Sequence, residues 1–149
     1  MVDERPDDAL ARALEEARTI ALVGASPNPA RASHQVGLFL RDAGYRVIAV
    51  NPLLEGDDLF GEPVRSALSD AAEADFVDVF RRSEALPEIV EEALGLPHIR
   101  TIWMQLGIRH AAAATRAREA GRRVIEDRCT KIEFLRLGLK ARRAASSAL

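Results

Sequence analysis

The amino-acid sequence predicts a single α/β domain built on a doubly wound parallel sheet. Short apolar runs rich in β-branched residues alternate along the 149 residues with stretches in which apolar residues recur at helical spacing. Strands and helices that alternate in this way pair in parallel through right-handed crossovers. A second observation is the order near the start, where an apolar run ends at Gly24, small residues follow, and a helical pattern then begins. Doubly wound domains use this order to present backbone N–H groups to a phosphate.

Five stretches have the composition of strands buried on both faces, because they are short, apolar and bounded by glycine, proline or polar residues. The first ends at Gly24, the second stops abruptly at Asn51-Pro52, and the fourth runs into Gly107. The expected strands are 20–23, 46–50, 76–80, 99–106 and 124–125.

Six stretches have the spacing of amphipathic helices. Asp7 or Asp8 can cap the first, and Ser66, Ser83 and Thr130 precede three others as capping residues. Gly44 and Gly121 are expected to end the second and the fifth, and residues 53–63 are expected to be an irregular connection. The expected helices are 7–17, 33–43, 66–74, 84–94, 109–120 and 131–137.

Composition restricts the kinds of partner. The chain is 48% hydrophobic, enough for one domain, which we place at residues 1–138, with a frayed tail at 139–149. A net charge of −2 gives no field that would recruit nucleic acid or an anionic membrane. The single cysteine allows no internal disulfide, and neither a signal peptide nor a membrane-spanning run is apparent, so a cytoplasmic location is expected.

The carboxyl ends of parallel strands meet at one edge of the sheet, where ligands of such folds bind. Arginines that leave the third strand there can grip a phosphate through two parallel N–H bonds, although pairing with Glu84 or Glu88 is the alternative. The candidate binding residues at this edge are Gly24, Ala25, Ser26, Asn28, Arg31, His34, Asn51, Pro52, Phe80, Arg81, Arg82, Gln105 and Gly107.

Two features argue against a nicotinamide dinucleotide as the ligand. The fingerprint G-x-G-x-x-G is missing, because Gly24 is followed by alanine at the place of the second glycine. The acidic residue that commonly ends the second strand and holds the ribose is replaced by Asn51. Asn51 could bind a ligand, or it could only cap a turn.

No catalytic set is evident. The three histidines are scattered, with neither the spacing nor the carboxylate company of a metal site. Trp103 is expected in the core, and Cys129 is expected to be a small buried residue and not a nucleophile. The sequence therefore predicts a nucleotide-type binding site without catalytic or metal-binding residues.

Five motifs, in order, resemble those of the small stand-alone CoA-binding proteins. That family is similar to the N-terminal CoA-binding domain of the succinyl-CoA synthetase α subunit and of ADP-forming acyl-CoA synthetases. The resemblance runs from about Ala17 to Leu137. The motifs are Val-Gly-Ala-Ser-Pro-Asn-Pro at 23–29, Gly-Tyr-Arg-Val-Ile-Ala-Val-Asn-Pro at 44–52, Asp-Val-Phe-Arg-Arg at 78–82, Trp-Met-Gln-Leu-Gly at 103–107 and Asp-Arg-Cys-Thr-Lys-Ile-Glu at 127–133.

The resemblance implies a Rossmann-like five-stranded parallel sheet, with helices on both faces and coenzyme A across its C-terminal edge. It supports binding and not catalysis, because the phosphorylated histidine of the synthetases lies in a further domain that this chain does not match. The first expectation is a protein that binds CoA or an acyl-CoA as a carrier, sensor or modulator of an acyl-CoA-using enzyme. The alternatives are a small NADP-dependent oxidoreductase and a CoA-binding subunit that completes an acyl-CoA ligase in trans.

Overall fold

A five-stranded, fully parallel sheet forms the centre of the molecule. The computed structural model describes residues 5–141. The strand order is β2-β1-β5-β6-β7, which confirms the doubly wound fold class. The strands are β1 (Thr19–Val23), β2 (Arg46–Val50), β5 (Phe76–Val79), β6 (Thr101–Met104) and β7 (Arg123–Ile125).

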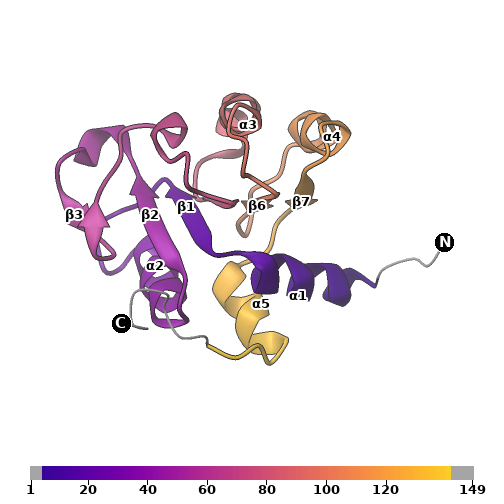
Figure 1. Ribbon diagram of the computed structural model, residues 1–149, viewed down its shortest axis with the longest axis horizontal. Helices are drawn as coiled ribbons and strands as arrows, with labels where there is room; N and C mark the ends of the chain where they lie inside the picture. Colours follow the sequence, from indigo (N-terminus) through magenta and orange to yellow (C-terminus); the bar gives the residue numbers. More distant parts are fainter. Residues whose placement is uncertain (1–4, 142–149) are drawn as a thin grey trace.

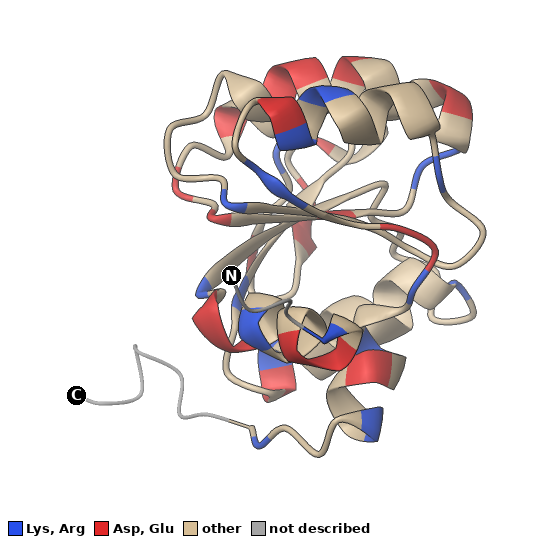
Figure 2. Ribbon diagram, turned by 90° about the vertical axis from the view of Figure 1, so that its right-hand side faces the viewer, with Lys and Arg blue, Asp and Glu red and all other residues tan. Residues whose placement is uncertain are grey.

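Helices cover both faces of the sheet, as the sequence predicts. In Figure 1, α3 and α4 lie on one side of the strands, while α1, α2 and α5 lie on the other. Figure 2 shows the two layers with the sheet between them, and both signs of charge are spread over both layers. The helices are α1 (Pro6–Glu16), α2 (Ala32–Asp42), α3 (Leu86–Leu94), α4 (Ala111–Glu119) and α5 (Thr130–Arg136).

Each face of the sheet has its own apolar core, because successive strand residues point to opposite faces. On the α3–α4 side, Val77 and Met104 pack with the buried faces of those helices. On the opposite side, Phe76 and Trp103 stack with ring centroids 5.8 Å apart. Trp103 is fully buried, as expected, and its indole N–H donates to the Arg128 carbonyl at 2.7 Å.

The predicted helix at 66–74 is wrong. The structure has only a short 3-10 turn, Leu68–Asp70, within this segment. Leu68, Ala71 and Ala74 are all buried, and their spacing of three residues suits successive 3-10 turns better than an α-helix.

Other boundaries also differ from the sequence-based expectation. The connection at 53–63 contains a 3-10 turn, η1 (Pro52–Leu54), and a small antiparallel hairpin of β3 (Asp58–Leu59) and β4 (Glu62–Pro63). The N-caps of α1 and α5 are Arg5 and Cys129, so the expected capping by Asp7, Asp8 or Thr130 is wrong. A 3-10 turn, Ser83–Ala85, precedes α3. Most of the tail that we expect to fray, residues 142–149, lies outside the described residues.

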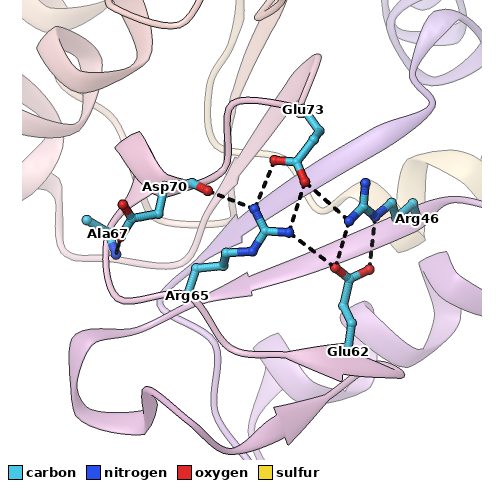
Figure 3. A network of polar contacts seen from close by, with 6 residues as sticks. All are labelled: Arg46, Glu62, Arg65, Ala67, Asp70 and Glu73. Carbon is cyan, nitrogen blue, oxygen red and sulfur yellow. Dashed lines mark hydrogen bonds and ion pairs between the residues drawn. The ribbon is translucent and has the colours of Figure 1, made fainter.

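Four charged side chains tie the connection after β2 back to that edge strand (Figure 3). Arg65 donates to both carboxylate oxygens of Glu73, at 2.8 and 2.9 Å, and Arg46 donates to both oxygens of Glu62, at 3.0 and 2.9 Å. A bond of 3.3 Å from Arg46 to Glu73 joins the two pairs. The Arg65 guanidinium holds the pKa of Glu73 well below its usual value, at about 2.

Replacing Glu73 by Gln is expected to reduce the free energy of unfolding modestly and to remove part of its acid sensitivity. The folded-state pKa is depressed, so the contribution is present above the ordinary value of 4.5 and is lost as the pH falls toward 2. Because the Glu73 side chain is 44% exposed, solvent screening limits the effect to about 1 kcal/mol or less. Urea unfolding at pH 7 and pH 3 would measure it. An equal loss for Glu73→Gln at both pH values would contradict the linkage.

Candidate functional site

The loops after β1 and β5 meet at the point where the winding of the sheet reverses. From β1 the chain runs through α2 to β2 on one side, and it then returns to β5 on the other side of β1. The carboxyl ends of the strands at such a switch point are where ligands bind in doubly wound folds. We call this end of the sheet, with the loops that follow its strands, the carboxyl edge.

Gly24 allows these two loops to approach closely. A Cβ atom on Gly24 would lie 2.8 Å from the carbonyl oxygen of Phe80 and 3.2 Å from Cδ of Arg81, and the backbone φ is +91°. A side chain at this position would first collide with the protein's own third-strand loop.

The loop between β1 and α2 is shaped by its own polar side chains. Ser26 Oγ accepts the N–H of Asn28 at 3.1 Å, and Asn28 Oδ1 accepts the N–H of Ala30 at 2.9 Å. From the first turn of α2, His34 Nδ1 lies 2.9 Å from the carbonyl oxygen of Ser26. Ala25 is buried in the layer beneath. This loop is therefore ordered before any ligand arrives.

Asn51 connects the end of β2 to that same loop. Its amide nitrogen donates to the carbonyl oxygen of Ala25 at 2.8 Å, and its Oδ1 accepts the N–H of Leu53 at 2.9 Å. Asn51 is thus the N-cap of η1, where Pro52 is the first residue and is exposed. Asn51 therefore caps a turn, which is one of the two roles that the sequence leaves open. Its bond to Ala25 also holds the first loop in place.

Three arginines on the two adjacent loops have exposed side chains: Arg31 after β1, and Arg81 and Arg82 after β5. Within residues 5–141, none of the three guanidinium groups forms an ion pair or a hydrogen bond. The alternative pairing of Arg81 or Arg82 with Glu84 or Glu88 is therefore not found. Phe80, half-buried, precedes this arginine pair.

Two of the predicted contacts at the end of β6 are already engaged within the protein. Gln105 is only 4% exposed, and its amide nitrogen donates to Asp78 at 2.6 Å and to Thr130 at 3.0 Å. The N–H of Gly107 donates to Asp127 Oδ1 at 2.6 Å. These groups order the loop, and Leu106 between them is the side chain that faces solvent, at 59% exposure.

Asp78 is a polar residue of this region that the sequence analysis missed. It lies in the middle of β5, the central strand, and is fully buried. Gln105 donates to one carboxylate oxygen and Thr130 Oγ1 to the other, at 2.9 Å. Burial raises its pKa to about 7, although both donors act in the opposite direction. A signal was available, since an aspartate interrupts the apolar run Phe-Val-Asp-Val-Phe.

The remaining candidates for chemistry have structural roles. Cys129 is buried, and burial raises the pKa of its thiol, which disfavours the thiolate that a nucleophile needs. His110 caps α4, its Nδ1 accepting the N–H of Ala113 at 3.1 Å. In the described part of the chain, no three potential metal ligands cluster together, and no helix is long and apolar enough to cross a bilayer.

Replacing Gly24 by Ala is expected to destabilise the protein more than the same change at Gly121. Gly121 also has a positive φ, +85°, but open space surrounds the position of its absent Cβ. Gly121→Ala should therefore reduce the free energy of unfolding only through the strain of a left-handed backbone, about 1–2 kcal/mol. Gly24→Ala should lose about 1–3 kcal/mol more, because the added Cβ crowds Phe80. Chemical unfolding of both variants would measure the difference. Equal losses would show that the two loops can move apart freely.

Comparison with known proteins assigns this chain to a family. A Thermus thermophilus protein, cell-free ID.343, is 42% identical, with a TM-score of 0.84 over 89% of this chain and 99% of that one. A Pyrococcus horikoshii OT3 protein is 31% identical, with a TM-score of 0.82 over 92% and 99%. The uncharacterized protein YneT of Bacillus subtilis (strain 168) is 40% identical over 120 residues, 80% of this chain and 87% of its own. The model of the CoA binding domain matches residues 18–134, and the chain therefore belongs to the CoA-binding domain family.

Proposed function

We propose that the carboxyl edge binds coenzyme A or an acyl-CoA. The observation that carries this proposal is the group of three unpaired arginines, Arg31, Arg81 and Arg82, on the two loops that meet at the switch point. Coenzyme A carries a pyrophosphate and a 3′-phosphate, so it offers several anionic groups to guanidinium side chains. Membership of the CoA-binding domain family supports the same ligand.

The geometry favours CoA over NAD or NADP. In a dinucleotide-binding domain, a carboxylate after the second strand accepts hydrogen bonds from the ribose hydroxyls. Here Asn51 occupies that position, and both ends of its amide are bonded to the protein's own backbone. An NADP-dependent oxidoreductase remains the second candidate, because Arg81 or Arg82 could hold a 2′-phosphate in place of the 3′-phosphate.

We infer that the protein binds its ligand without transforming it, as a carrier, a sensor or a modulator of an acyl-CoA-using enzyme. His34 is bonded to the first loop and His110 caps a helix, which leaves neither of them poised for phosphoryl transfer. The raised pKa of the Cys129 thiol also argues against covalent catalysis. A subunit that completes an acyl-CoA ligase in trans would have the same binding edge.

Titration calorimetry with CoA, NAD and NADP tests the proposed ligand. CoA is expected to bind at least tenfold more tightly than either dinucleotide, because the glycine fingerprint that both dinucleotides use is missing and, for NAD, Asn51 also replaces the carboxylate that holds the ribose. Mass spectrometry of ligand released by denaturing the purified protein provides an independent measurement. Equal or tighter binding of NADP would reject the CoA proposal in favour of the oxidoreductase.

Arg81→Ala and Arg82→Ala are expected to weaken the binding of CoA more than that of dephospho-CoA. A charge-assisted hydrogen bond to the 3′-phosphate is worth roughly 1.5–3 kcal/mol, or about 10- to 150-fold in affinity. Affinities should be compared at constant salt, since phosphate contacts are screened.

Arg116→Ala is a matched control for these two variants. Arg116 is an exposed arginine that pairs with Glu91 on the α3–α4 layer. Its replacement by alanine therefore removes the same charge as the test variants do, but at a position away from the carboxyl edge. It should leave both affinities within about twofold of the wild type. If neither Arg81→Ala nor Arg82→Ala changes the ratio of the two affinities, these side chains do not contact the 3′-phosphate, and Arg31 becomes the residue to test.

A further inference from the structure

Asp78 occupies an unusual position for a carboxylate. It lies in β5 between Leu22 of β1 and Trp103 of β6, at the centre of a sheet whose strand residues are otherwise apolar over most of their length. Its partners come from two other elements, Gln105 at the end of β6 and Thr130 at the start of α5. Gln105 also donates to Thr130, so the three side chains form a closed triangle, which we call the Asp78 triad.

The Asp78 triad lies directly beneath the carboxyl edge. Asp78 precedes Phe80 by two residues, about 7 Å along an extended strand. Because side chains alternate, Asp78 points to the same face as Phe76, which is the face that α2 and α5 cover. The buried Ala25 of the first loop belongs to this layer too. An anion held at the start of α2 would therefore sit on the same side of the sheet as Asp78.

No cation compensates the charge of Asp78 among the described residues. The charge of Asp78 acts on the Cys129 thiol and helps to raise its pKa. That thiol is neutral at ordinary pH and supplies no positive charge. Lys131 of α5 lies over the ring of Phe39, 5.6 Å from its centroid, and Glu133 pairs with Arg128 and Arg136.

Charged groups on two other elements of this face are engaged elsewhere. His34 of α2 is bonded to Ser26, and Asp7 of α1 pairs with Arg136. Two neutral donors are therefore the contacts that stabilise the ionised form, and burial opposes them strongly enough to raise the pKa to about 7.

We propose that Asp78 takes up a proton when the carboxyl edge binds an anionic ligand, so that ligand affinity rises as the pH falls. This inference rests on the proposed function, since it needs a polyanion such as CoA at that edge. A ligand charge that lay about 10 Å from an ionised Asp78, at an effective dielectric constant of about 20, would repel it enough to change affinity by roughly tenfold. By linkage, the ligand raises the proton affinity of Asp78 by the same factor.

The test is calorimetry of the full chain with dephospho-CoA between pH 5.5 and 8.5, in buffers of different ionisation enthalpy. Dephospho-CoA is the better probe, because it lacks the 3′-monophosphate, which itself titrates near pH 6. The wild type is expected to take up roughly half a proton per ligand near pH 7, where Asp78 is about half ionised. Its affinity should fall about tenfold over the pH range.

Asp78→Asn keeps the size of the side chain and removes the titration. It is expected to abolish the proton uptake and to give an affinity that stays near the low-pH value of the wild type. Asp75→Asn is the matched control. Asp75 lies at the opposite end of the same strand, where it accepts the N–H groups of Arg18 and Thr19. Its own pKa is raised by burial, and Asp75→Asn should leave the uptake unchanged.

Thr130→Val provides a second variant that does not depend on the folding of Asp78→Asn. Removing a donor to the carboxylate should raise the pKa of Asp78 and move the maximum of proton uptake to higher pH, an effect that a purely structural role would not produce. Ligand binding without proton uptake in the wild type, or uptake that persists in Asp78→Asn, would overturn this inference alone. Failure of CoA and dephospho-CoA to bind at any pH would instead overturn the proposed function and, with it, this coupling.

Discussion

The contact between the loops after β1 and β5 is the constraint on which the carboxyl edge depends. A Cβ on Gly24 would lie 2.8 Å from the Phe80 carbonyl oxygen, so the absence of a side chain at residue 24 lets the two loops adjoin this closely. Arg31 follows one of these loops and the Arg81-Arg82 pair lies on the other, and all three side chains are exposed. Asn51 adds the end of β2 to this assembly through its bond to Ala25. Three strand ends are thus held together by backbone contacts and one amide.

The Asp78 triad performs a related task on the other side of β5. Gln105 and Thr130 both bond to one carboxylate, which connects the end of β6 to the first turn of α5. Asp127 then fixes the turn that follows through the N–H of Gly107 and the Arg109 side chain. Removing a buried partner from such a network leaves unsatisfied polar groups, so the arrangement specifies one geometry strongly. The cost of burying the carboxylate appears as its raised pKa.

The sequence predicted the order of strands and helices well, because each strand is a short apolar run and each α-helix has an apolar stripe. It failed at 66–74, where Ser66 resembles a cap, but Leu68, Ala71 and Ala74 are buried at a spacing of three. The positions of the candidate binding loops followed from parallel topology alone. The topology did not predict the hydrogen-bond partners of individual residues. Asn51, Gln105 and Gly107 have partners that are 20 to 27 residues away in the sequence. Asp78 was missed because a buried carboxylate is rare, and only the fold shows its two donors.

Several arginines of this chain form ion pairs that connect one element to another. Arg46 and Arg65 pair with glutamates beside β2, Arg116 pairs between α3 and α4, and Arg136 connects α5 to α1. These arginines link elements to one another, and a partner in the chain neutralises each one. Arg31, Arg81 and Arg82 have no such partner within residues 5–141, although acidic residues are abundant and Glu84 follows Arg82 by two positions. Unpaired guanidinium groups on adjacent, preordered loops can bind an anion without first breaking an ion pair. That availability supports the proposal that a polyanion binds at the carboxyl edge.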